Sequence, residues 1–271
     1  MYSGTTFRRG SGRIVGVHQK IDRAARHTLD KHIKKSLKFP GIRSILHFEG
    51  KNGPDGLKLK GSKIDNPWHF INPANPDDHA LIIMINDHIF NLAEALAAKN
   101  IVRASFESAW LAHSITDGLT PAHHYALDDK IEELWGKTHD QRKGIKDRNI
   151  IRGINRRDTL SKNWQYWGAG GVFTAHLFYE MGVASAIASE KFKTVELDGE
   201  DIKQLQDEGY ENMFMKSVIK IHSLNIYDNF NKNGWTVDLA RETKDILVPE
   251  IIRSVALAWY QAILLSKGNK K

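Results

Sequence analysis

Long segments with helical spacing are the feature that most limits how this chain can fold. From Asp77 to about Lys99 the apolar residues recur as they do in a buried helix, and the acidic start suits the helix dipole. Comparable segments lie at about 14–37, 102–119, 172–191 and 248–265. Few segments show the period-two alternation of strands. The sequence therefore predicts an all-α fold, a multi-helix bundle in which residues 1–271 form a single domain.

Four other segments lack this pattern. Residues 1–13 form a polar, flexible leader and residues 266–271 a polar tail. Glycines and prolines recur through residues 50–78, which indicates an extended loop. Residues 128–165 are crowded with charged side chains, so we expect a solvated insertion with no role in the core.

The composition limits the chemistry. The chain has no cysteine, so a transition-metal site must use His, Asp, Glu and water, and 13 histidines are enough for several ligands. The net charge of +7 favours anionic partners such as nucleic acid or anionic lipid. We find no secretory signal and no apolar run of about 20 residues that would span a membrane, so a cytoplasmic location is expected.

The segment from Ala112 to His124, AHSITDGLTPAHH, is the most informative for chemistry. His113 and Asp117 stand four residues apart, so their side chains leave the same face of a helix and are able to share one metal ion. A proline then closes the helix just before His123. The segment therefore predicts three ligands that converge from a helix and its exit turn.

His–carboxylate pairs at this spacing are weak signals alone, because roughly 1.5 of them are expected by chance in a chain of this composition. Two of the observed pairs are embedded in apolar helices, where buried imidazole and carboxylate groups are costly unless they pair or bind a metal. Both readings, a buried hydrogen bond and a metal site, stay open for each pair. The chain contains His18/Asp22, His113/Asp117, His124/Asp128 and His176/Glu180, of which the second and fourth are the embedded ones.

The ordered motifs resemble the zinc-dependent phospholipase C and S1/P1 nuclease family. That family carries H-x3-D-x5-H with a proline shortly before the last histidine, and further on H-x3-E or H-x3-D; this chain has both motifs. The family also has an early histidine on its first helix, which VHQKIDRAA matches. Its loop aspartate and the His-Phe pair some fourteen residues later are matched by GPDG and WHFINP.

The resemblance implies an all-helical fold with two or three Zn²⁺ ions at the base of a cleft. It also implies that Asp55 orients or deprotonates the attacking water. The first metal would be bound by Asp55, His69, His113 and Asp117, the second by His123, His176, Glu180 and a water, and the third by Asp117 and His18.

The third metal site departs from the family pattern. Secreted members use the amine and carbonyl of a mature N-terminal tryptophan there, whereas His18 of this chain stands seventeen residues inside. The site is therefore absent, completed by water, or reached by the flexible leader.

Other assignments also stay open. Asp65, Glu49 or His47 compete with Asp55 for the first metal, and His124 is expected beside the ligands or at the rim. The other histidines are expected to be ordinary.

The function implied is a metal-dependent hydrolase of phosphoric esters, phospholipase C-like, in which the zinc cluster activates water. Its substrate would be a phospholipid or a nucleic acid, and the H-x3-E ending favours the phospholipase branch. Two alternatives are an S1/P1-like nuclease, with Trp164 and Trp167 in a loop that stacks on bases, and a non-catalytic, metal-stabilised helical binding protein. A histidine-aspartate phosphohydrolase needs an adjacent His-Asp pair on a core helix, and His139–Asp140 lies in the charged insertion.

Overall fold

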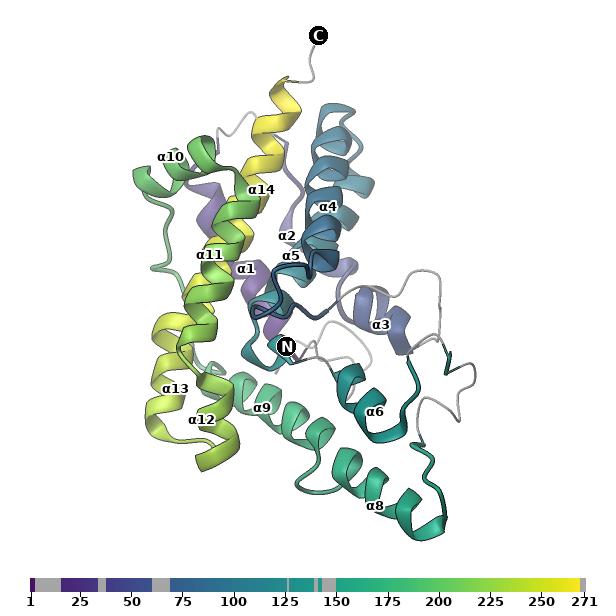
Figure 1. Cartoon of the computed structure of the whole chain (residues 1–271). Helices are drawn as coiled ribbons and strands as arrows, with labels where there is room; N and C mark the ends of the chain where they lie inside the picture. The colour runs from purple at the N-terminus through teal and green to yellow at the C-terminus, as the bar shows by residue number, and fades with distance from the viewer. Residues whose placement is uncertain are drawn as a thin grey trace.

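The computed structural model describes residues 1–2, 16–33, 38–59, 69–125, 127–138, 141–142 and 150–268. Every regular element within these ranges is helical, which confirms the all-α prediction (Figure 1). The elements are α1 (Val17–Asp30), α2 (Ile42–His47), the 3₁₀ turn η1 (Gly50–Asn52), α3 (Pro54–Leu59), α4 (Ala80–Ala97), α5 (Ile101–Gly118), the 3₁₀ turn η2 (Pro121–His124), α6 (Leu127–Trp135), α8 (Arg156–Trp167), α9 (Val172–Ala186), α10 (Gly199–Glu208), α11 (Tyr210–Ser223), α12 (Ile226–Asn233), α13 (Val237–Glu242), the π-helical turn η4 (Thr243–Leu247) and α14 (Val248–Gly268).

Helix α14 organises the main core, because it packs against α1, α4, α5, α10 and α11. Its Trp259 is fully buried, and the indole Nε1–H donates to the carbonyl oxygen of Ser108 on α5 at 3.0 Å. A buried tryptophan needs such an acceptor for its one polar atom. The contact fixes α5 against α14, and α5 carries the centre of the candidate site.

Helix α5 is buried on nearly all sides from Ala104 onward, although many of its side chains are polar. Ser105, Ser108 and Ser114 satisfy their hydroxyl groups by donating to the carbonyl oxygen four residues earlier. Oε2 of Glu107 forms a hydrogen bond with Nδ1 of His88 at 2.5 Å. The remaining buried polar side chains of the helix's last turns belong to the candidate site.

A second, smaller core lies between α6, α8 and α9, at the lower edge of Figure 1. It is built around Ile131, Ile151 and Tyr166, so the prediction that residues 128–165 have no core role is wrong. Most of the described charged residues of this segment are exposed, whereas Ile131, Ile151 and Tyr166 face the space between the helices. Trp164 and Trp167 lie on α8 and not in a loop, because the Asn155 side chain caps the helix start.

Several predicted boundaries also change. Residues 50–78 contain η1 and α3 where we expected only a loop, since Pro54 begins α3 at a helical position that needs no N–H donor. Helices α1 and α9 end at Asp30 and Ala186, earlier than expected, and α10 to α13 had not been predicted. Outside the described residues lie 3–13 of the leader, Asp65, 139–140 and 269–271 of the tail.

Two helical runs are long and apolar enough to cross a membrane by length and composition alone, Ala80–Ala97 and Val237–Gly268. The core helix of a soluble protein passes the same test, and 72% of the most apolar window of the second run is buried inside the protein. These runs are weak support for a membrane span, and the expectation that none exists stays a prediction.

Glu250 on α14 accepts hydrogen bonds from α11, so its effect on stability reports on the packing of these two helices. It accepts from Ser217 at 2.7 Å and Lys220 at 2.6 Å, and from Arg253. Burial alone would raise its pKa, but these donors lower it from 4.5 to about 2. A lowered carboxyl pKa stabilises the fold above pH 4.5, and this contribution disappears as the pH falls through about 2.

We therefore expect wild type to be more stable than Glu250→Gln at neutral pH and the difference to vanish near pH 2. Urea unfolding followed by circular dichroism across this range measures it. The matched control is Glu200→Gln, at an exposed position on α10. A stability difference between wild type and Glu250→Gln that does not change with pH would contradict the lowered pKa of Glu250.

Candidate metal centre

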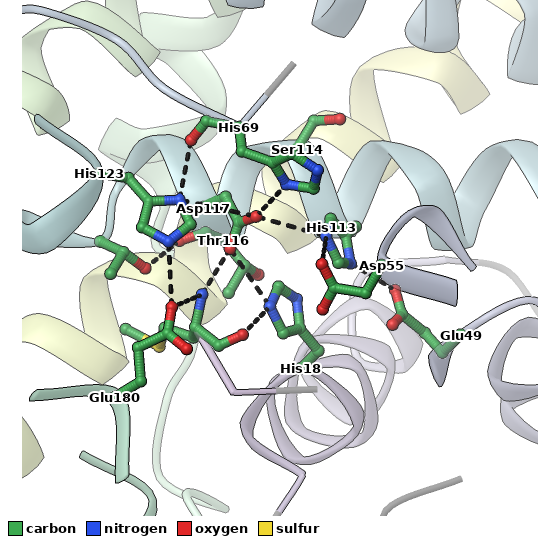
Figure 2. Close-up of polar contacts among 12 residues, drawn as sticks. His18, Glu49, Asp55, His69, His113, Ser114, Thr116, Asp117, His123 and Glu180 are labelled. Carbon is green, nitrogen blue, oxygen red and sulfur yellow. Dashed lines mark hydrogen bonds and ion pairs between the residues drawn. The ribbon is translucent and has the colours of Figure 1, made fainter. Parts of the chain in front are cut away.

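Six segments of the chain bring all eight predicted ligands together around the end of α5. All of these ligands except His176 are labelled in Figure 2. Their side-chain ligand atoms form three groups, and within each group these atoms lie within 4.8 Å of one another. The groups are His18/His113/Asp117, Asp55/His69/His113 and His123/His176/Glu180. The contributing segments are α1, α3, the chain at His69, α5, η2 and α9.

Asp117 lies at the centre of the cluster and is 1% exposed. Its Oδ2 lies 2.6 Å from Nδ1 of His69 and 3.3 Å from Nε2 of His113. The same oxygen is 3.6 Å from Nδ1 of His123, and Oδ1 is 3.2 Å from Nε2 of His18. A buried carboxylate is unfavourable unless opposite charges or donors compensate it. Asp117 therefore links the groups through one carboxylate.

His123, His176 and Glu180 form the group at the α9 side. His176 and Glu180 are one turn apart on α9, and Nε2 of both histidines lies 3.1 Å from Oε1 of Glu180. The two imidazole rings are stacked with their centroids 4.9 Å apart. The ring of Phe70 stacks on His123 at 5.1 Å, so an apolar wall holds one ligand in place.

The proton of His123 is fixed by its surroundings. Nδ1 lies 2.8 Å from the carbonyl oxygen of His69, which accepts only. Burial lowers the pKa of His123, so at neutral pH the ring carries one proton, which we assign to Nδ1. Nε2 then points a lone pair at Glu180, and two acceptors at 3.1 Å repel unless a cation lies between them. Metal-binding histidines typically have this outer N–H bond to a carbonyl oxygen.

His113 gives a second sign of a cation site. The residue is 1% exposed, and neither of its ring nitrogens has a hydrogen-bond partner in the described part of the chain. Nε2 lies 3.8 Å from Asp55 and Nδ1 lies 3.5 Å from Glu49, distances too long for hydrogen bonds. The nearest carboxylate oxygen, Oδ2 of Asp117, lies 3.3 Å from Nε2 and does not form a hydrogen bond to it. A buried imidazole whose nitrogens make no hydrogen bond is costly, and a metal ion at Nε2 would remove that cost.

Met1 also contacts this cluster. The amino nitrogen of Met1 lies 2.5 Å from Oδ1 of Asp117 and 3.4 Å from Oε1 of Glu180. The carbonyl oxygen of Met1 lies 2.7 Å from Nε2 of His18. Among the three options left open for the third site, this geometry corresponds to a site reached by the leader.

Electrostatics favour ionised carboxylates in the cluster. Burial would raise the pKa of Asp117, but His123, the Met1 ammonium group and His113 lower it well below its usual value. Burial acts the same way on Glu180, where the Met1 ammonium group and His176 lower the pKa. Burial would lower the pKa of His113, yet the surrounding carboxylates raise it well above normal. The cluster therefore presents ionised carboxylates, which are the form that binds a metal ion.

The competing assignments have clear outcomes. Glu49 is buried and approaches Nδ1 of His113, whereas Asp55 approaches Nε2, the nitrogen that also faces Asp117, so Glu49 does not replace Asp55. His124 lies beside the ligands, where its Nε2 is 3.0 Å from the carbonyl oxygen of Gly118, and burial lowers its pKa to about 4.

The sequence analysis missed two residues. Met1 had no recognisable signal. Asp22 is 1% exposed on α1, in the charge environment of Glu49 and His113, and its four-residue spacing from His18 was a usable signal.

A cleft above the cluster stays a prediction. Cavities of about 150 Å³ and 410 Å³ occur elsewhere, and neither is lined by any of the eight residues.

Comparisons with known proteins give no match. No model of a protein family matches the sequence, and a search of curated proteins finds no match.

Metal binding should be visible as added stability. We expect Zn²⁺ at 100 times its dissociation constant to stabilise metal-free wild type by about 2.7 kcal/mol per independent site, because the ion binds only the folded protein. Thermal unfolding with zinc and with a chelator measures this gain. Asp117→Asn should lose most of it, since it removes the carboxylate charge that contacts histidines of all three groups.

Asp87→Asn is the matched control, because Asp87 is an exposed residue on the neighbouring helix α4. It should retain the full zinc effect. An Asp117→Asn protein that gains as much stability from zinc as wild type would refute the shared role of Asp117.

Proposed function

We propose that this protein is a metal-dependent hydrolase of phosphoric esters with two or three Zn²⁺ ions bound by the cluster. The donor set contains imidazole nitrogens and carboxylate oxygens without sulfur, which suits zinc and also manganese or iron. The resemblance of the ordered motifs to the zinc-dependent phospholipase C and S1/P1 nuclease family favours zinc. When bound, such ions lower the pKa of water and neutralise phosphate oxygens.

The observation that carries this proposal is a set of three candidate metal-ligand groups that all contact Asp117, two of which include a partly exposed carboxylate, Asp55 in one and Glu180 in the other. A purely structural site is closed by four protein ligands, whereas a catalytic site keeps one position for water or substrate. Here the side chain of Asp55 is 28% exposed and that of Glu180 is 13% exposed, while His113 and Asp117 are enclosed. Water and substrate would reach each of these groups through its partly exposed carboxylate, Asp55 or Glu180.

The chain's own residues have separate tasks in this scheme. Asp117 and His113 hold the groups together from a rigid, buried helix. Asp55 lies at the exposed edge, and His113 and His69 lower its pKa against the effect of burial, so it is ionised and able to accept a proton from water. The carbonyl oxygen of His69 keeps the proton of His123 on Nδ1 and leaves Nε2 as a ligand.

The third site would use His18, Asp117 and the backbone of Met1. The carbonyl oxygen and amino nitrogen of Met1 supply oxygen and nitrogen donors next to both side chains. This set resembles the family's third site, with methionine where secreted family members have tryptophan. The backbone donors do not depend on which side chain the first residue carries.

A non-catalytic metal clamp is the alternative, and the deep burial of six of the eight side chains favours it. The two functions differ in what Asp55 does. A clamp needs Asp55 only for binding, whereas a hydrolase also needs it for proton transfer.

The activity test uses zinc-loaded protein and bis-p-nitrophenyl phosphate. We expect wild type to hydrolyse it and Asp55→Asn to lose about 10² to 10⁴ in kcat, since general-base catalysis contributes that much. Zinc content, measured on the same samples, should fall by at most one ion per chain in this variant.

His79→Gln, an exposed position at the start of α4, is the control and should keep wild-type activity and zinc. Zinc-loaded wild type that cleaves neither phosphodiesters nor phosphomonoesters would contradict the hydrolase proposal and support the clamp.

A further inference from the structure

Helix α8 and the turn before it expose large apolar side chains. Ile154 is 96% exposed, Leu160 is 72% exposed and Trp164 is 69% exposed. Leu160 and Trp164 are one turn apart, so they lie on the same side of α8. We call these two residues, together with Ile154 on the turn before the helix, the α8 stripe. Single exposed apolar residues are common, but neighbouring ones of this size indicate an interaction surface.

The α8 stripe has no role in holding α8 in place. The helix is anchored by Tyr166, which is buried in the smaller core, and by Asn163, whose amide group bonds both backbone groups of Ile151. Trp167 also contacts this core, with its ring 4.8 Å from that of Tyr166. The stripe therefore lies beside the anchoring face and is free to contact another molecule.

Positive charge surrounds the stripe. Arg156 and Arg157 are exposed on the first turn of α8, one turn before Leu160 on the same side. The one acidic residue of α8, Asp158, is bonded by the backbone N–H of Ile154 and paired with Lys162. An apolar stripe with tryptophan and flanking arginines has the composition of a helix that lies in a membrane interface.

We propose that the α8 stripe docks on the surface of a membrane that contains anionic phospholipids. Aliphatic side chains such as Ile154 and Leu160 gain nothing from base stacking, which argues against nucleic acid as the occupant. A contact between the stripes of two copies would offer Arg156 and Arg157 no free carboxylate from α8, since its one acidic residue is already bonded. An anionic lipid surface satisfies both the apolar and the positive groups.

The position of α8 connects this surface to the metal centre. Helix α8 leads directly into α9 (Figure 1), and the ring of Trp167 lies 4.7 Å from that of Phe173. Phe173 is three residues before His176 on α9, so the two side chains lie on the same side of that helix. A docked α8 would hold the candidate site next to lipid headgroups. That the headgroups are its substrate rests on the proposed function, whereas docking itself does not.

The test measures sedimentation of metal-free protein with vesicles, so that it is independent of hydrolysis. Vesicles of phosphatidylcholine alone are compared with vesicles of equal parts phosphatidylcholine and phosphatidylserine. Wild type should bind the anionic vesicles. Leu160→Ala/Trp164→Ala should bind at least about tenfold more weakly, because two large apolar contacts are removed. Arg156→Gln/Arg157→Gln should also bind anionic vesicles several-fold more weakly, with a smaller dependence on salt.

Ile83→Ala/Phe90→Ala is the matched control, since these side chains are 59% and 54% exposed on α4, away from α8. It should bind as wild type does. The proposal is overturned if wild type does not sediment with anionic vesicles, or if the stripe variant and the α4 variant bind equally well. It is also overturned if the stripe variant loses only single-stranded DNA binding or only self-association.

The two proposals fail separately. Vesicle binding by a protein that hydrolyses no phosphoric ester would leave docking intact and remove the proposed function. Conversely, the zinc-loaded Leu160→Ala/Trp164→Ala variant should hydrolyse bis-p-nitrophenyl phosphate at the wild-type rate. Its hydrolysis rate should fall below that of wild type only on phospholipid vesicles. A variant equally fast on vesicles would remove docking and leave the hydrolase proposal intact.

Discussion

The buried carboxylate of Asp117 is the constraint on which the arrangement of this protein depends. Placing an ion inside a protein costs several kcal/mol unless other groups compensate it. Here four histidines and the amino group of Met1 surround it, and they come from segments far apart in the chain. The segments carrying these groups must therefore meet at the end of α5. The core around α14 holds α5 and α1 in place for this meeting.

Much of this could be predicted from the sequence. The pairs His113/Asp117 and His176/Glu180 stand on long apolar helices, where a four-residue spacing places both side chains on one face, and the structure brings all of them together. The helical class followed from the same periodicity. Local patterns were sufficient because a helix fixes the relative positions of residues one turn apart.

The rest depends on tertiary contacts. No local pattern shows that the first residue reaches Asp117, since 116 positions separate them. The small core around Tyr166 was hidden because its few apolar residues are scattered among charged ones. The α8 stripe was equally hidden, because Trp164 is apolar like a core residue and only the folded chain shows that it is exposed.

The central claim is that metal ions occupy the cluster around Asp117, and anomalous X-ray scattering tests it most directly. Crystals of zinc-loaded protein would be measured just above and just below the zinc absorption edge. We predict at least two peaks, one between His123, His176 and Glu180 and another beside Asp55, His69 and His113. No peak at either position, with Glu180 in direct hydrogen bonds to protonated histidines, would contradict the account.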